Sequence, residues 1–254
     1  MERRSPEPYP ATTDVLGLAD AVRRNVALVV EGKDDVVLTA VTVLFAGGHL
    51  LVEDVPGVGK TVLAKALARS VDATMRRIQF TPDLLPSDIT GVNVYDQGKG
   101  DFTFRPGAVF ANIVIGDEIN RASPKTQSAL LEAMEEHQVS MDGRTMPLPR
   151  PFMVVATQNP VEMDGTFPLP EAQRDRFMAQ ISMGYPSARA ELDMLLHHGE
   201  KDPLDTLRPV ASADDVEHAI DAIASLHTSD ALRQYVVDLV AATRSHPKQR
   251  PGAT

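Results

Sequence analysis

Short apolar runs alternate with stretches of helical periodicity along much of the chain. The expected strands are residues 50–52, 77–80, 112–115 and 152–157, and the expected helices are residues 16–30, 34–45, 60–70 and 124–136. Ser123 is a suitable N-cap for the last of these helices, with Pro124 at its first position. Apolar strands that alternate with helices are typical of a parallel sheet covered on both faces, so the pattern predicts a three-layer αβα fold of the α/β class.

Two segments interrupt this alternation and have the pattern of β-hairpins. Residues 91–104 contain a cluster of turn residues between two stretches of β-prone residues. Residues 138–148 contain Asp142-Gly143, and the Asp-Gly pair is a strong hairpin signal. We therefore predict two β-hairpins inserted into the α/β framework.

The pattern changes again near Pro186, after which no further strand is expected. Three helices are predicted there, over residues 187–198, 213–226 and 229–244. The Pro-rich, charged start of the chain lacks an apolar core and is expected to be a flexible tail rather than a signal peptide. The predicted organisation is a tail over residues 1–13, an α/β core over residues 14–186 and a partial helical lid over residues 187–254.

Composition narrows the class of protein. The 254 residues carry a net charge of −10, which argues against general adhesion to nucleic acid or to anionic membranes. The chain has no cysteine, so it has no disulfides or thiolate metal sites, and a cytoplasmic location is expected. The longest uncharged stretch, residues 36–52, is broken by Gly47-Gly48 and fits a buried helix and strand better than a membrane span.

The first chemical signal is the loop between the strand at residues 50–52 and the helix at residues 60–70. Residues 54–61 nearly match the P-loop pattern G-x-x-x-x-G-K-S/T, with Asp54 in place of the first glycine. The residues expected to bind ATP are Pro56, Gly57, Val58, Gly59, Lys60, Thr61 and Val62. Backbone N–H groups and Lys60 would bind the phosphates, while the Thr61 hydroxyl would bind Mg²⁺. A glycine-rich turn that only happens to precede a lysine is the weaker interpretation, because the flanking strand and helix fit a P-loop.

Candidate partners of this loop follow the later strands. Asp117 and Glu118 end the run 112–115, where Asp117 would hold Mg²⁺ through water and Glu118 would polarise the attacking water. Asn159 ends the next strand and could order that water, although by itself it equally fits a turn. Arg174 and Arg176 could supply an arginine finger or belong to a solvated helix face, and composition does not separate the two.

At this point the chain resembles the MoxR family of AAA+ ATPases over residues 15–247. The stretches that carry the resemblance are Gly47–Glu53 with the loop that follows, Gln79–Asp88, Asp117–Ala122, Ala156–Pro160 and Leu169–Gln173. The resemblance implies a ring, usually a hexamer, with Asn159 as sensor 1 and Arg176 as the finger that acts on the neighbouring subunit's ATP. It also implies that the two hairpins are the inserts of the helix-2-insert class.

The resemblance further implies a chaperone-like machine that assembles or metallates other complexes, often with a partner that carries a von Willebrand factor A domain. Arg174 departs from the family, which usually has an apolar residue there. The resemblance implies a sensor-2 arginine on a lid helix beyond Gly252, so the lid within this sequence is interpreted as partial.

Three functions remain open from the sequence. ATP-driven remodelling of client proteins leads, because Glu118, Asn159 and Arg176 are all present. A nucleotide-bound switch or scaffold with little turnover is the second hypothesis, suggested by Asp54 and the partial lid. A DNA motor is the third, but the acidic composition disfavours it, and Lys99 and Arg144 are weak support for a phosphate-gripping pore.

Overall fold

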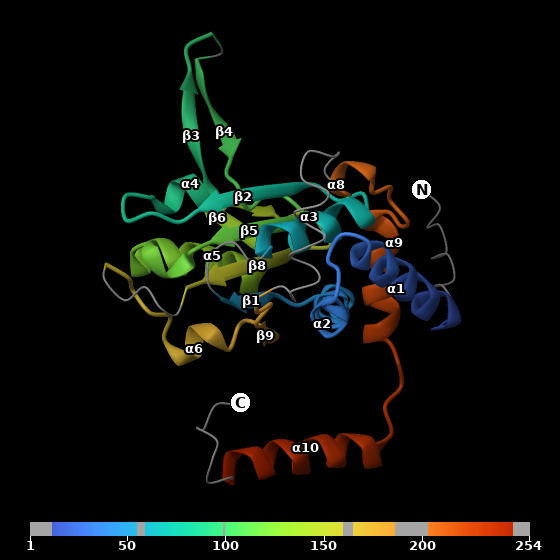
Figure 1. Ribbon diagram of the computed structural model, residues 1–254. Coiled ribbons are helices and arrows are strands. Elements are labelled where there is room, and N and C mark those ends of the chain that lie inside the picture. The colour runs from blue at the N-terminus through green and yellow to red at the C-terminus, as the bar shows by residue number, and fades with distance from the viewer. Residues whose placement is uncertain (1–11, 55–58, 99, 160–164, 186–202, 246–254) are drawn as a thin grey trace, which may run out of the picture.

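The computed structural model describes residues 12–54, 59–98, 100–159, 165–185 and 203–245, and a central five-stranded parallel sheet organises them (Figure 1). Its strands lie in the order β2-β5-β8-β1-β9. They are β1 (Leu50–Glu53), β2 (Met75–Gln79), β5 (Ile113–Asp117), β8 (Met153–Gln158) and β9 (Ala179–Ile181). The predicted α/β fold with a parallel sheet is confirmed, and β9 is a strand that the sequence pattern did not reveal.

Helices cover both faces of the sheet and divide the core in two. The main ones are α1 (Thr12–Ala27), α2 (Asp34–Phe45), α3 (Lys60–Ser70), α4 (Pro86–Thr90) and α5 (Pro124–Glu136). Ile113 and Ile115 of β5 pack in the core on the α1, α2 and α3 face, whereas Val114 between them packs in the core on the α4 and α5 face. This alternation follows from the period of two in a strand, and it gives the predicted three layers.

The predicted helices over residues 34–45, 60–70 and 124–136 have the observed bounds, and the Ser123 hydroxyl caps α5 by accepting from the Thr126 N–H. The prediction for α1 was shifted, because α1 begins at Thr12 and residues 28–30 form a hydrogen-bonded turn instead of helix. The predicted tail therefore overlaps the first residues of α1, and the rest of it lies outside the described residues.

Both predicted hairpins are present as two-stranded antiparallel ribbons. They are β3 (Gly91–Asp96) with β4 (Asp101–Pro106), and β6 (Gln138–Met141) with β7 (Arg144–Pro147). Asp142 and Gly143 have φ angles of 49° and 74°, the left-handed backbone that a tight two-residue hairpin turn requires. The β3–β4 ribbon projects from the body of the molecule (Figure 1).

The C-terminal helices α8 (Pro203–Thr206), α9 (Ala213–Ala224) and α10 (Asp230–Ser245) differ in how they pack. Val216 and Ala219 of α9 belong to the core with α1 and α2. In contrast, α10 stands apart from the body (Figure 1), and its apolar side chains Leu232, Tyr235, Val236, Val237 and Leu239 are exposed. The predicted helix at residues 187–198 and the predicted boundary at Pro186 lie outside the described residues. Within the described part of the chain, every helix is too short or too polar to cross a membrane.

Candidate active site

The carboxyl ends of three adjacent strands bring the predicted site residues together. β5, β8 and β1 are neighbours and parallel, so the residues that follow them meet at one edge of the sheet. Lys60 begins α3 shortly after β1, Asp117 and Glu118 lie at the end of β5, and Asn159 follows β8. The predicted phosphate-binding residues Pro56, Gly57 and Val58 lie outside the described residues, whereas Gly59, Lys60, Thr61 and Val62 are described.

The start of α3 has the geometry of an anion site. Gly59 is the N-cap and has a φ angle of +92°, which favours glycine over any other residue. The helix that follows has eleven residues, and its first N–H groups and dipole favour a negative group at this end. This local geometry is what a phosphate-binding loop requires.

Lys60 is half-buried and lies near several negatively charged side chains. Its Nζ donates to the carbonyl oxygen of Asp54 at 2.8 Å. Burial lowers the pKa of Lys60, while the negative charges of Asp54, Asp117 and Glu118 act in the opposite direction. The ammonium group therefore lies within electrostatic reach of both carboxylates that end β5, as a phosphate-binding lysine beside a metal site should.

Asp54, the departure from the P-loop pattern, makes contacts toward β9. Its Oδ2 accepts from the Ser182 hydroxyl at 3.0 Å and from the backbone N–H of Gly184 at 2.6 Å. The side chain is buried, so these donors offset the cost of removing a carboxylate from water. Asp54 thus ties the beginning of the phosphate loop to the segment after β9, a contact that a glycine could not make.

Asp117 has both carboxylate oxygens engaged. Oδ1 accepts from the Thr157 hydroxyl at 3.3 Å, and Oδ2 accepts from Nε of Arg77 at 2.5 Å. The Thr157 hydroxyl in turn accepts from the backbone N–H of Glu118 at 3.0 Å. A single threonine on β8 therefore fixes the positions of both acidic residues at the end of β5.

Glu118 is held by two side chains and by a strained backbone. Its Oε2 accepts from Nε2 of Gln79 at 3.1 Å and pairs with Nε of Arg121 at 3.1 Å. Its φ angle is +58°, a left-handed conformation that costs a non-glycine residue about 1–2 kcal/mol.

Four residues at this edge were missed by the sequence reasoning, namely Arg77, Gln79, Arg121 and Thr157. Arg77 and Gln79 are two apart on β2, so they lie on one face of a strand that pairs with β5. Two polar residues at that spacing, near the carboxyl end of a predicted strand, were a signal that could have identified them. Thr157 carried no comparable signal.

The predicted finger residue is not at this edge. The backbone N–H of Met178 donates to the carbonyl oxygen of His49, just before β1, which places this segment at the amino end of the sheet. Arg176 donates to the carbonyl oxygen of Leu131 at 3.0 Å and pairs with Glu135 near the end of α5. Arg176 therefore lies at the opposite end of the sheet from Lys60.

Arg174 has a different environment from Arg176. Its Nη2 donates to Oε1 of Gln180 at 2.7 Å and lies 3.8 Å from Oε1 of Glu53. The carboxylate of Glu53 also accepts from Gln158 and Gln180. Arg174 thus belongs to a polar network on the face of β9, β1 and β8, and the two arginines cannot be treated as equivalent.

The donor set at the carboxyl edge suits a magnesium ion. Thr61 and Asp117 offer a hydroxyl and a carboxylate, the hard oxygen ligands that Mg²⁺ prefers, and phosphate oxygens would supply others. Among the residues that the structure describes, no group of three or more His, Asp or Glu forms a separate metal cluster.

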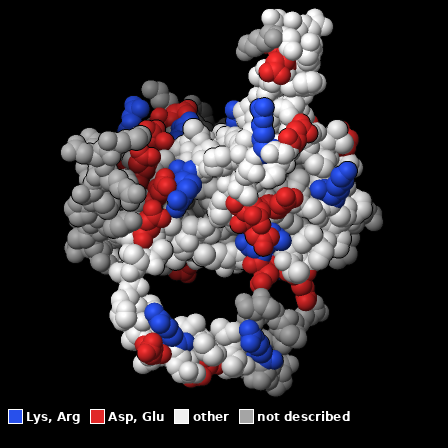
Figure 2. Space-filling view, turned by 180° about the vertical axis from the view of Figure 1, so that it is seen from behind, with Lys and Arg blue, Asp and Glu red and all other residues white. Residues whose placement is uncertain are grey.

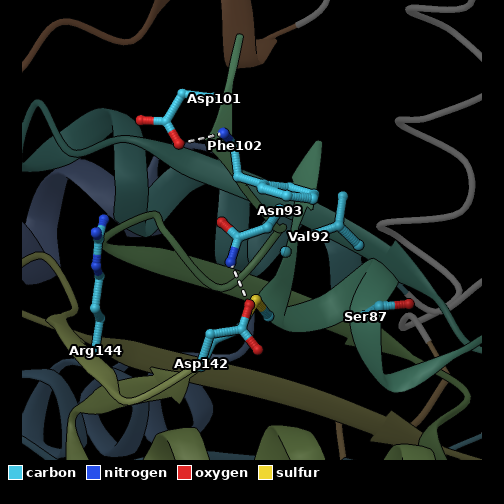
Figure 3. Close-up of a pocket in the computed structure, with 9 residues that line it drawn as sticks. Ser87, Val92, Asn93, Asp101, Phe102, Asp142 and Arg144 are labelled. Carbon is cyan, nitrogen blue, oxygen red and sulfur yellow. Dashed lines mark hydrogen bonds between the residues drawn. The ribbon is translucent and has the colours of Figure 1, made fainter. Parts of the chain in front are cut away.

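A hollow of about 580 Å³ lies between the two hairpins (Figure 3). Val92, Phe102 and Met141 give it apolar walls, and Asp101, Asp142 and Arg144 add charges of both signs. Asn93 of β3 donates to Oδ2 of Asp142 in the turn between β6 and β7, so the two hairpins are in direct contact.

Comparison with known proteins gives consistent matches. Residues 49–179 match the family model described as "ATPase family associated with various cellular activities (AAA)". A solved structure described as an ATPase from Cytophaga hutchinsonii superposes with a TM-score of 0.81 at 41% identity, covering 91% of this chain and 71% of that chain.

Curated relatives extend the likeness to almost the whole chain. Uncharacterized protein YeaC of Bacillus subtilis is 51% identical over 226 residues, covering 89% of this chain and 71% of that protein. Chaperone MoxR1 of Mycobacterium tuberculosis is 46% identical over 225 residues, covering 89% of this chain and 59% of that protein. Protein MoxR of Methylorubrum extorquens is 34% identical over 244 residues, covering 89% of this chain and 69% of that protein. The chain thus spans between 59% and 71% of the length of these relatives.

Proposed function

The chain belongs to the MoxR family of AAA+ ATPases, and from this premise we propose that it hydrolyses Mg²⁺-bound ATP at the carboxyl edge of the sheet to remodel or assemble other proteins. The observation that carries this proposal is the meeting of Lys60, Asp117 and Glu118 at the ends of adjacent strands. A relative named as a chaperone supports the remodelling role.

Each residue at the edge has a proposed role. The loop residues 56–62 bind the phosphates, and Thr61 and Asp117 hold Mg²⁺, which would neutralise charge on the β- and γ-phosphates. Glu118 polarises the attacking water, and the buried Asn159 orients it. Gln79 and Arg121 hold the Glu118 carboxylate in place before the water is bound.

Catalysis in a ring, with six subunits as the proposed number, would complete the site. Arg176 is at the amino end of the sheet and cannot reach the phosphates bound by its own chain. A neighbouring subunit's nucleotide is therefore its proposed target, where it would stabilise the developing charge on the γ-phosphate. The proposed location of the ring is the cytoplasm, in line with the absence of cysteine.

The two hairpins are the proposed contact for the client protein. Phe102 and Tyr95 are both largely exposed on the projecting ribbon. Their rings pack edge to face, with 5.4 Å between the ring centroids. The hollow beside them has apolar walls and charged groups, which suits an extended peptide segment (Figure 3). A partner with a von Willebrand factor A domain follows from the family resemblance alone.

The test of this proposal is the ATPase rate per chain as a function of protein concentration, with the mass of the assembly measured on the same samples. A rate that rises with assembly is expected, because Arg176 acts only between subunits. Turnover that is full in a monomer would contradict catalysis in a ring. Phe102→Ala should reduce stimulation by a client while the basal rate stays near that of the wild type.

A nucleotide-bound switch with little turnover is the second candidate. One observation favours it: the carboxylates of Asp117 and Glu118 are both already engaged by side chains of the chain itself. Prolonged incubation with ATP separates the two functions, since a switch would retain bound ATP and an ATPase would accumulate ADP. A DNA motor is less well supported, because Lys and Arg are scattered among Asp and Glu on the described surface shown in Figure 2.

A further inference from the structure

Arg77 is a cation in direct contact with Asp117, the proposed magnesium ligand. β2 is at one edge of the sheet and pairs with β5 in the register that sets Arg77 opposite Ile115 and Gln79 opposite Asp117. The side chain of Arg77 extends along the strand direction to Asp117, with Nε 2.5 Å from Oδ2. The Arg77 side chain is 55% exposed and that of Asp117 only 10%, so a half-exposed cation contacts a largely buried carboxylate.

The contact uses an oxygen that Mg²⁺ would need. Oδ1 of Asp117 accepts from the Thr157 hydroxyl, which leaves Oδ2 as the oxygen that faces Arg77. A guanidinium N–H and a magnesium ion or its water cannot both occupy the same position at one carboxylate oxygen, and their positive charges repel. The Arg77 contact therefore opposes the binding of Mg²⁺ at Asp117.

We infer that Arg77 is a positioning residue that holds Asp117 in the nucleotide-free chain and competes with Mg²⁺ for its Oδ2, thereby setting the magnesium concentration at which ATP binds. This inference rests on the proposed function, since it assumes a Mg²⁺–ATP site at Asp117. Arg77 also donates from Nη2 to Oε1 of Gln79 at 3.4 Å, so the guanidinium has a second acceptor available when it leaves Asp117.

Two other roles for Arg77 make different predictions. If the ion pair only stabilises the fold, its removal should lower the melting temperature and leave the magnesium dependence of nucleotide binding unchanged. If Arg77 instead contacts the phosphates, its removal should weaken nucleotide binding both with and without Mg²⁺. Competition alone predicts unchanged binding without the metal and a lower magnesium requirement.

The experiment measures binding of a fluorescent, non-hydrolysable ATP analogue to the full chain as Mg²⁺ is titrated, with a parallel arm in EDTA. The variants are Arg77→Ala and Arg77→Lys, and the control is Arg76→Ala. Arg76 is the adjacent exposed residue of β2, whose side chain points to the other face of the strand. The control removes the same charge from the same strand without touching Asp117.

For Arg77→Ala we expect the half-saturating magnesium concentration to fall about two- to fivefold, the size that loss of a half-exposed ion pair implies. Arg77→Lys should lie between Arg77→Ala and the wild type, and Arg76→Ala should match the wild type. The melting temperature of each variant checks that it is folded. If Arg77→Ala folds poorly, Arg77→Gln replaces it in the magnesium titration.

A magnesium requirement in Arg77→Ala that equals or exceeds that of Arg76→Ala would overturn the inference while leaving the proposed function intact. Weaker binding in EDTA would overturn it in favour of a phosphate contact. If the wild type bound no nucleotide under any condition, the proposed function itself would fail, and the inference with it.

Discussion

The two ends of the central sheet are built from different chemistry. At the carboxyl end, Lys60 lies within electrostatic reach of the carboxylates of Asp117 and Glu118, which are held by threonine, arginine and glutamine side chains. At the amino end, the buried polar groups include His49, which accepts from the Val154 N–H and contacts the carbonyl oxygen of Met134. Arg176 is near it, paired with Glu135 on α5.

This difference indicates a division of labour within each subunit. The carboxyl end has groups that can bind phosphate, bind a metal ion and polarise water, but the predicted arginine finger is absent from it. The amino end has that arginine, whereas the phosphate-binding helix start that the described residues show is at the carboxyl end. Two chains arranged with the carboxyl end of one against the amino end of the other would combine these groups, and the following predictions test that arrangement.

Arg176→Ala is expected to have the largest effect. It should bind ATP nearly as the wild type does but hydrolyse it about 10³–10⁵-fold more slowly, the range that arginine fingers supply. The measurement is steady-state ATPase rate beside nucleotide affinity. Arg174→Ala is the matched control. It removes the same charge two positions earlier in the chain, from an arginine that contacts Glu53 and Gln180 instead of Glu135. Equal losses in both variants would contradict a specific role for Arg176.

Glu118→Gln should reduce hydrolysis about 10²–10⁴-fold, the contribution of a general base, while ATP remains bound. Glu136→Gln removes an exposed carboxylate from α5 and is its control. Mixing Glu118→Gln with Arg176→Ala should restore part of the activity, because some interfaces then pair an intact Glu118 with an intact Arg176 from the neighbour. A mixture no more active than its two components would count against catalysis between subunits.

His49 makes the amino end sensitive to acid. Burial is the main reason that its pKa is lowered from 6.5 to about 4 in the folded chain. The unfolded chain therefore binds a proton that the folded chain does not, and stability should fall by up to about 3 kcal/mol as the pH drops from 6.5 to about 4. Denaturant unfolding of His49→Gln should show a flatter pH dependence in this window. His227→Gln, at an exposed position, should retain the wild-type slope.

Local chemistry explains which parts of the fold could be predicted. The bounds of α3 and α5 were predicted because Gly59 before α3, and Ser123 and Pro124 at the start of α5, specify where these helices begin. β9 was missed because it has three residues with half-buried or exposed side chains, and only its pairing with β1 makes it a strand. No local pattern of three residues could have shown that pairing.

The candidate site shows the same contrast between local patterns, which the sequence reveals, and contacts between distant residues, which it does not. Lys60, Asp117 and Glu118 were identified because each follows a strand at a spacing that phosphate chemistry requires. Arg77 and Thr157 were not, because their contacts with Asp117 join residues 40 positions apart. Those contacts depend on the register of β2 and β8 against β5, which the sequence pattern does not specify.

Lys60→Ala should have the smallest of these effects in free energy. Its loss of ATP affinity nevertheless decides whether the carboxyl end is the phosphate site. Loss of one charged contact to the phosphates costs about 1.5–3 kcal/mol, which corresponds to roughly ten- to hundredfold weaker ATP binding. The fold should remain intact, because among the described residues this half-buried side chain makes one hydrogen bond, to the Asp54 carbonyl oxygen. Calorimetry gives the affinity, and Lys65→Ala, later on the same helix, is the control for loss of a positive charge. Equal affinity in the wild type and Lys60→Ala would remove the phosphate site from the carboxyl end, and with it the reason for placing Arg176 against a neighbouring subunit.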